Sequence, residues 1–133
     1  MRGDELRRLL AGLRPVLSEE EYVFCVLPDL ASAQFEALAP MAMVRETEGV
    51  TVVIEHARAQ SAGLSCSPPF QRISLGVHSS LLAVGLTAAV ASRLADHGIC
   101  ANMLAGYHHD HIFVPAGQGR RALALLESLQ ASG

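Results

Sequence analysis

The sequence predicts an α+β protein made of two ferredoxin-like units of the βαββαβ type, each an antiparallel sheet with helices packed on one face. A repeated arrangement of elements and one break support this prediction. Each half contains strands enclosed between two helices, and the second half reads strand–helix–strand–strand–helix. The segment Ser65-Cys66-Ser67-Pro68-Pro69 separates the halves. We therefore expect a degenerate N-terminal unit over residues 1–69 and a better-formed unit over residues 70–133.

The first half contains two predicted helices and three predicted strands. Asp4 is placed to cap a first helix that Pro15 ends, with one apolar stripe formed by Leu6, Leu9, Leu10 and Leu13. A continuous apolar run predicts a strand over 22–27 that is buried on both faces. Further strands are expected over 41–45 and 51–55, followed by a short helix over 57–62 that ends at Gly63.

The second half has clearer periodicity. Alternation predicts a strand over 71–77. Helical spacing predicts a helix over 83–97, with Leu86, Val90 and Leu94 facing inward and Gly98 just after its end. Two strands over 101–107 and 111–115 are joined by a tight turn, and a last helix covers 120–130. No further strand follows, so another part of the chain or another subunit must cover the open edge of this sheet.

Composition excludes several classes of protein. Half of the 133 residues are apolar and 17% are charged, which is typical of a globular chain. The net charge of −3 and the absence of Trp provide no basic aromatic face for nucleic acid. The three widely spaced cysteines, Cys25, Cys66 and Cys100, match neither a disulfide framework nor a zinc motif. Cys25 also lies within a buried strand run, where a thiol is inert packing.

The location is predicted from the N-terminus and from one long uncharged run. The first residues are charged and lack the apolar core of a signal peptide, which favours the cytoplasm. Residues 73–92 carry no charge, but their pattern changes from alternation to helical spacing. That change favours a strand and a buried helix over a membrane span.

Three stretches of the second half resemble ACT domains: residues 73–90, residues 94–99 with Gly98-Ile99, and residues 105–115. Residues 105–115 resemble one branch of that family in particular, the small bacterial stand-alone proteins with two ACT domains in tandem, which are similar to the regulatory tails of aspartate kinases. The ACT signature after the first strand is Asp, any residue, Pro and Gly. Here Val84-Gly85 occupies the Pro-Gly position, and a longer loop without the acidic residue precedes it. The resemblance implies a non-catalytic sensor of an amino acid or similar metabolite, bound between ACT units.

Elementary chemistry makes the same loop a plausible ligand site. A helix that begins near Ala83 leaves its first amides without partners, and Gly85 lets a ligand carboxylate approach the backbone closely. Side chains in the loop supply donors and acceptors, and Asn102 at the start of the facing strand can hold an α-ammonium group. The candidate ligand-binding residues are His78, Ser79, Ser80, Val84, Gly85, Leu86 and Asn102.

Five of these residues also have a purely structural interpretation. Ser79 and Ser80 can cap the helix, and Gly85 can serve close packing of the helix on the sheet. Asn102 can bond to the strand backbone, and His78 can be a structural polar residue at a strand end.

The segment His108-His109-Asp110-His111 allows three interpretations: a hairpin turn, a contact in a ligand pocket or interface, and a metal site. Alternation in an extended chain puts His109 and His111 on one face and the other two side chains on the opposite face. That arrangement disfavours a metal site and favours a turn.

The sequence contains no catalytic motif, so we expect no enzyme and no cofactor. The leading hypothesis is a regulatory sensor that binds a small molecule, with an amino acid as the expected ligand, and that forms a homodimer without nucleic acid or membrane partners. The alternative is an interaction or dimerisation module without a ligand. A third hypothesis is a metal-binding protein that uses residues His108 to His111.

Overall fold

The computed structural model describes residues 2–29 and 31–132, and its contacts divide the chain into two compact units. The terminal unit consists of Met1–Glu19 and Gln71–Gly133, and the central unit consists of Glu20–Phe70. Residues 2–19 therefore pack with the C-terminal half, although the chain reaches that half only after the central unit. The predicted division into 1–69 and 70–133 remains a prediction about how the sequence divides into ACT-like units.

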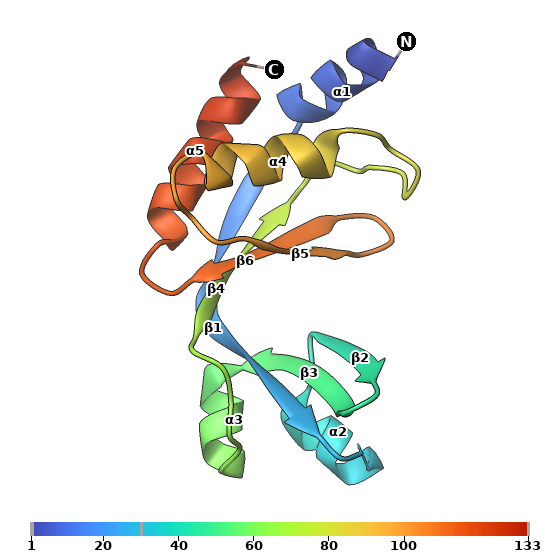
Figure 1. Ribbon diagram of the computed structural model, residues 1–133, viewed down its shortest axis with the longest axis vertical. Coiled ribbons are helices and arrows are strands. Elements are labelled where there is room, and N and C mark those ends of the chain that lie inside the picture. Colours follow the sequence, from blue (N-terminus) through green and yellow to red (C-terminus); the bar gives the residue numbers. More distant parts are fainter. Residues whose placement is uncertain (1, 30, 133) are drawn as a thin grey trace. The chain divides into compact units, whose positions relative to one another are not determined.

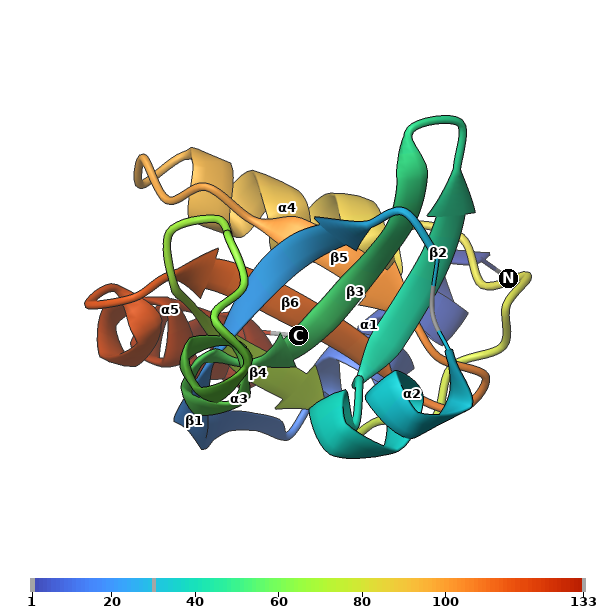
Figure 2. The same ribbon diagram turned by 90° about the horizontal axis from the view of Figure 1, so that it is seen from below.

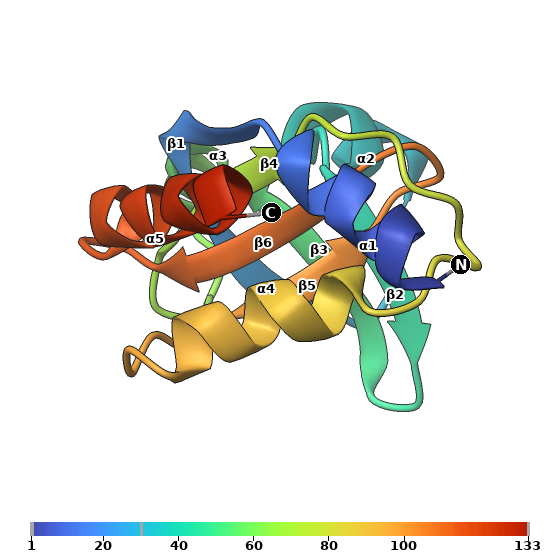
Figure 3. The same ribbon diagram turned by 90° about the horizontal axis from the view of Figure 1, so that it is seen from above.

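The terminal unit has helices on one side of a sheet whose strands are not in sequence order (Figures 1 and 3). Its elements are α1 (Arg2–Ala11), the first part of β1 (Pro15–Leu27), β4 (Phe70–Leu75), α4 (Leu86–Ala95), β5 (Asn102–Ala105), β6 (Asp110–Pro115) and α5 (Gly119–Ser132). The strands follow the order β1-β4-β6-β5. β5 and β6 pair antiparallel, from Asn102 opposite Phe113 to Ala105 opposite Asp110.

Alternation along the strands produces the core of the terminal unit. Ile73 and Leu75 of β4 and Ile112 and Val114 of β6 point to the same face and are fully buried. The three helices cover that face with Leu9, Leu86, Val90, Leu94, Ala122, Leu126 and Leu129, and Leu13 joins this core from the connection between α1 and β1. The inward residues predicted for the helix after β4, Leu86, Val90 and Leu94, are confirmed as core residues.

The edge that the sequence left open in this sheet is covered by β1. β1 lies next to β4 in the sheet. The Gly76 and Val77 amides donate to the Arg14 and Leu13 carbonyls at 2.9 and 3.2 Å. Of the two alternatives, another part of the same chain is therefore the one observed. This strand occupies the place of the missing last strand of a βαββαβ unit.

The central unit repeats the order strand–helix–strand–strand–helix (Figure 2). It contains the later part of β1, α2 (Ser32–Leu38), β2 (Ala42–Glu46), β3 (Gly49–Glu55) and α3 (His56–Ala62), with strand order β2-β3-β1. β3 pairs antiparallel with both neighbours, and Val52 lies between Cys25 and Met43. A small core forms from Val23, Cys25, Leu27, Leu38, Val52, Ile54 and Ala59.

Several predicted boundaries are wrong by a few residues, for identifiable reasons. α1 begins at Arg2, so Asp4 lies in its first turn and cannot be its cap. β4 ends at Leu75 and α4 begins only at Leu86, because Gly85 takes a left-handed conformation at the N-cap. The predicted helix end is close to the observed one, since Gly98 has a φ of 72° and the Ile99 amide bonds back to the Leu94 carbonyl at 3.0 Å.

The uncharged run of residues 73–92 is divided between β4, a loop and α4, as predicted. Over residues 2–29 and 31–132, no helix has the length and apolar character needed to cross a membrane.

Candidate functional site

The candidate site lies where two connections of the terminal unit meet: the loop over 76–85 between β4 and α4, and the turn over 106–109 between β5 and β6 (Figures 1 and 3). Two adjoining hollows open there. The larger, of about 390 Å³, is lined by His78, Ser79, Ser80, Leu81, Tyr107 and His108. The smaller, of about 90 Å³, is lined by Ser79, Ser80, Leu81, Ala83, Leu86, Thr87, Ala105, Gly106 and Asp110.

Aromatic rings from both connections pack together at the larger hollow. The His78 ring stacks on His108 at a centroid distance of 5.3 Å and meets the edge of His109 at 4.7 Å. Tyr107 contacts His108 at 5.0 Å. His109 Nδ1 donates to the Val77 carbonyl at 3.3 Å. These contacts hold the loop after β4 against the hairpin turn.

The polar segment that suggested a metal site is mainly a hairpin turn. The Gly106 amide donates to the His109 carbonyl at 2.9 Å and closes the turn. A Cβ atom at Gly106 would lie 2.8 Å from that carbonyl oxygen, so only glycine fits without a shift. The turn covers 106–109, and Asp110 already belongs to β6. In the part of the chain that the structure describes, no group of three His, Cys, Asp or Glu residues is placed to hold a metal ion.

The smaller hollow brings a helix N-terminus and a carboxylate together. Leu86 and Thr87, the first residues of α4, line the hollow with Asp110. The first amides of any α-helix have no intrahelical acceptor, and they carry the positive end of the helix dipole. Ser79 Oγ donates to Asp110 Oδ2 at 3.5 Å and links the loop to the carboxylate.

The capping interpretation of Ser79 and Ser80 is wrong. The N-cap of α4 is Gly85, and no side chain bonds to the helix amides there. Ser80 Oγ instead accepts from the Leu82 amide at 3.0 Å, which forms a tight turn within the loop. Both serines line the hollows, so their side chains are available to a ligand.

Gly85 serves close packing, but against a helix and not against the sheet. Its φ is 99°, and a Cβ atom built there would lie 3.1 Å from Leu6 Cδ2 of α1. Neither Gly85 nor the exposed Val84 lines either hollow. Their predicted role as ligand contacts remains a prediction.

Asn102 lies away from the other predicted residues. It begins β5 opposite Phe113, whereas Ala105 at the other end of β5 lines the smaller hollow. Asn102 Nδ2 donates weakly to Cys100 Sγ at 3.9 Å. Of the predicted set, the structure brings together His78, Ser79, Ser80 and Leu86, and it does not bring Asn102 to them.

Residues from the hairpin complete the site and were not in the predicted set. Tyr107, His108 and Asp110 reach it because the turn folds β6 back beside β5. The sequence signal for these residues was the polar segment His108 to His111, for which a pocket contact was one of three interpretations. Choosing between a pocket contact and a plain turn required the position of the loop over 76–85, which the sequence does not provide.

His111 is held apart from the ring cluster by its own hydrogen bond. It lies half-buried on β6, and its Nδ1 shares a hydrogen bond of 2.8 Å with Ser74 Oγ. Burial lowers the pKa of His111, the nearby Arg72 guanidinium and His109 lower it further, and Asp110 opposes them. His111 is therefore neutral at pH 7.

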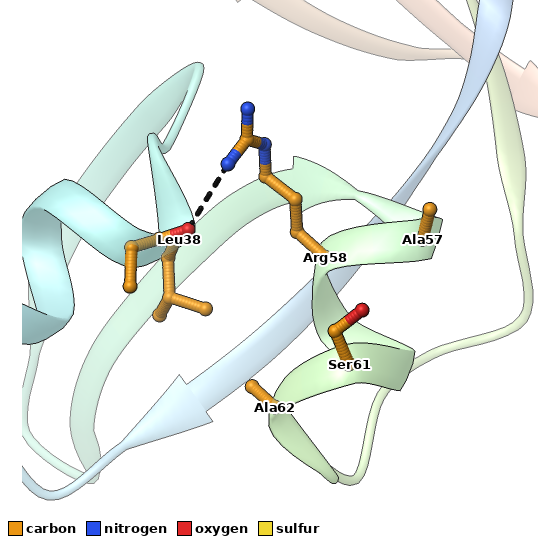
Figure 4. Close-up of a pocket in the computed structure, with 6 residues that line it drawn as sticks. Leu38, Ala57, Arg58, Ser61 and Ala62 are labelled. Atoms are coloured by element: carbon orange, nitrogen blue, oxygen red, sulfur yellow. Dashed lines mark hydrogen bonds between the residues drawn. The ribbon is translucent and has the colours of Figure 1, made fainter.

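The hollow between α2 and α3 of the central unit is less suited to a zwitterionic ligand. Figure 4 shows this hollow, which is lined by Ala37, Leu38, Ala57, Arg58, Ser61 and Ala62. The Arg58 guanidinium already donates to the Ala37 carbonyl at 3.1 Å. No carboxylate lines this hollow to receive an ammonium group.

Two family models, both described as ACT domain, match residues 4–71 and residues 71–128. The chain belongs to the ACT domain family. The duplicated βαββα order of its two units fits this assignment, and the resemblance noted from the sequence is confirmed.

Solved structures share the fold over most of this ACT protein. A Vibrio cholerae protein of unknown function, described as a possible transport protein, is 45% identical and superposes with a TM-score of 0.86 over 98% of this chain and 99% of that chain. The ligand-free regulatory subunit of aspartate kinase from Thermus thermophilus is 14% identical, with a TM-score of 0.64 over 89% and 97% of the two chains. An Agrobacterium tumefaciens protein is 18% identical, with a TM-score of 0.66 over 84% of each chain. A comparison with curated proteins gave no match.

Proposed function

We propose that this ACT protein is a non-catalytic regulatory sensor that binds an amino acid in the two adjoining hollows of the terminal unit. The observation that carries this proposal is the presence of the α4 N-terminus and the Asp110 carboxylate in one hollow. An amino acid has a carboxylate and an ammonium group on the same carbon atom. A helix N-terminus favours the first group, and a carboxylate favours the second.

The other lining residues suit the rest of such a ligand. The ligand carboxylate would accept from the amides at Leu86 and Thr87, and its ammonium group would donate to Asp110 and Ser79. The ligand side chain would enter the larger hollow beside His78 and the hairpin turn. The proposal assigns no contact to Asn102.

Family membership and fold support a regulatory role. ACT domains are regulatory modules, and regulatory subunits of aspartate kinase share this fold at low identity. We propose a cytoplasmic homodimer. β5 is the edge strand of the terminal unit, and an open edge can recruit a second copy.

The decisive experiment is thermal unfolding of ligand-stripped protein with each of the standard amino acids. A true ligand at a hundredfold excess over its Kd should stabilise the protein by about 2.7 kcal/mol. Asp110→Asn should abolish that stabilisation, because it removes the charge opposite the ammonium group. Asp96→Asn is the matched control, since Asp96 is exposed at the other end of α4. The proposal fails if no amino acid stabilises the protein, or if Asp110→Asn responds as well as the control.

A second candidate function is a protein-docking module without a ligand. Large side chains with apolar surface are exposed to solvent around the hollows. Leu82 is 87% exposed, Tyr107 is 78% exposed, and Leu81 and Val84 are more than half exposed. Light scattering separates the two functions. A dimer whose stability and dissociation do not respond to any amino acid would favour docking.

A further inference from the structure

Two cysteines that are far apart in the sequence lie on adjacent segments of the central unit. Cys25 lies on β1, between the core residues Val23 and Leu27, and is 1% exposed. Cys66 is exposed in the segment between α3 and β4. Both are free thiols in this structure, as is Cys100 in the terminal unit.

Hydrogen bonds between the neighbouring residues hold these two segments together. The Ser67 amide donates to the Phe24 carbonyl at 3.0 Å, and the Phe24 amide donates to Ser67 Oγ at 3.0 Å. One bond joins the two backbones and the other joins the β1 backbone to a side chain, so Ser67 lies directly beside Phe24. The Phe24 ring also meets Phe70 edge to face at 5.5 Å and so holds the following residues of the segment against β1.

Cys25 directly follows Phe24, and Cys66 directly precedes Ser67, so the two cysteines lie on adjacent segments. Neighbouring hydrogen-bonded strands are spaced about 4.7–4.9 Å apart, which falls within the Cα separation of about 4.4–6.8 Å that a disulfide needs. Cys66 is also near enough to the Cys25 thiol to raise its pKa.

The two thiols have different reactivities. Burial raises the pKa of the Cys25 thiol, and the adjacent Cys66 raises it further, so Cys25 is a poor nucleophile toward a reagent in solution. Cys66 is exposed and meets that reagent first. Cys25 is then placed to attack the Cys66 sulfur and not an external one.

We propose that Cys25 and Cys66 form a reversible disulfide site that is oxidised by low-molecular-weight disulfides such as oxidised glutathione. The Cys66 thiolate attacks the glutathione disulfide, forms a mixed disulfide and releases one glutathione thiolate. Cys25 gives up its proton and attacks the Cys66 sulfur, which releases the second glutathione. Two protein thiols are oxidised to one disulfide, and one glutathione disulfide is reduced to two thiols.

The test uses the full chain with oxidised glutathione, followed by alkylation and peptide mapping without reduction. We expect a cross-linked peptide that joins Cys25 to Cys66 and is two hydrogen atoms lighter than the two free peptides together, and an alkylated or glutathionylated Cys100. Dithiothreitol should restore the original mass. Glutathione retained on Cys66 without a cross-link, or a cross-link to Cys100, would overturn the proposal.

Two variants sharpen this test. Cys100→Ser should form the cross-link as fast as the wild type, because it removes a thiol of the other unit. Cys66→Ser changes an exposed residue, so it should fold and leave Cys25 unoxidised under the same conditions. Rapid glutathionylation of Cys25 in Cys66→Ser would contradict the assigned order of reaction. Because neither variant touches the hollows of the terminal unit, failure here leaves the amino-acid proposal unaffected.

Discussion

At the residue scale, Gly85 combines an unusual backbone conformation with a tight contact. Its φ of 99° is one that side chains with a Cβ rarely adopt, and the same Cβ would press on Leu6 at 3.1 Å. The position therefore shapes the N-terminus of α4 and its packing on α1 together. The sequence interpretation placed Gly85 in contact with a ligand, and its dihedral angle could not be inferred from the residue pattern.

We expect Gly85→Ala to destabilise the protein by about 1 kcal/mol or more, measured by denaturant unfolding. Gly117→Ala is the matched control, because Gly117 has a φ of 93° and nothing lies within 4 Å of its Cβ position. The excess loss at Gly85 over Gly117 measures the contact with Leu6. Equal losses in the two variants would show that this contact carries no strain.

His111 supplies the pH dependence expected at this scale. Its pKa in the folded protein is lowered from 6.5, so the unfolded chain binds the proton more readily. The contribution of His111 to stability is therefore present above pH 6.5, and it is lost as the pH drops through 6.5 toward the lower pKa of the folded protein. His111→Gln should lose less stability than the wild type between pH 7 and mildly acid pH, by denaturant titration at each pH. An unchanged pH slope would contradict this assignment.

At the element scale, a side chain of β4 accepts hydrogen bonds from backbone amides at the start of α5. Gln71 Oε1 accepts from the Gly117 amide at 3.1 Å and from the Gly119 amide at 2.9 Å. Gly119 is buried, and a Cβ atom there would lie 2.5 Å from the same oxygen. A strand residue thus satisfies the first amides of a helix that follows it by more than forty positions.

Gln71→Leu should cost about 1–3 kcal/mol of stability, because it leaves a buried amide without an acceptor. Gln71→Glu keeps an acceptor of the same shape at a helix N-terminus and should retain most of the stability. Denaturant unfolding of the two variants makes the comparison. If Gln71→Glu is as destabilised as Gln71→Leu, the acceptor role is refuted.

Elements were predictable where periodicity is long and terminators are present. α3 ends at Gly63, which has a φ of 66°, and α5 follows its leucine stripe. α2 was missed because its seven residues lie between Pro28 and Pro40 and show too little periodicity. The first part of β1 was missed because three consecutive glutamates make Pro15–Glu21 appear to be a loop. Neither segment carries the apolar periodicity that identified the other helices and strands.

At the scale of the whole molecule, the terminal unit draws on both ends of the chain. Leu9 and Leu13 belong to the same core as the leucines of α5, and Gln130 Nε2 donates to the Ala11 carbonyl at 3.0 Å. The sequence repeat predicted two units of one fold correctly. It could not predict that the N-terminal segment completes the later unit, because that pairing links residues about sixty positions apart.

A fragment of residues 70–133 should therefore fail to unfold cooperatively, since it lacks α1 and the strand that covers β4. The same fragment followed by a flexible Gly/Ser linker and residues 2–19 should regain a cooperative transition, measured by circular dichroism and by dispersion of amide NMR signals. Cooperative unfolding of 70–133 alone would instead support the division into 1–69 and 70–133 as independent folding units.

Because β1 belongs to both units, the alternation of its side chains between the two faces has to stay in step along the whole strand. Leu17 packs on the core of the terminal unit, and Val23, Cys25 and Leu27 pack in the core of the central unit, all at odd-numbered positions. A single residue inserted between Glu19 and Glu20 would change the parity of one set against the other, and one of the two cores would receive the wrong side chains. An insertion of two residues would leave the parity intact. Relatives of this protein should therefore vary in length at the loops and at even steps within β1, but not by one residue along it.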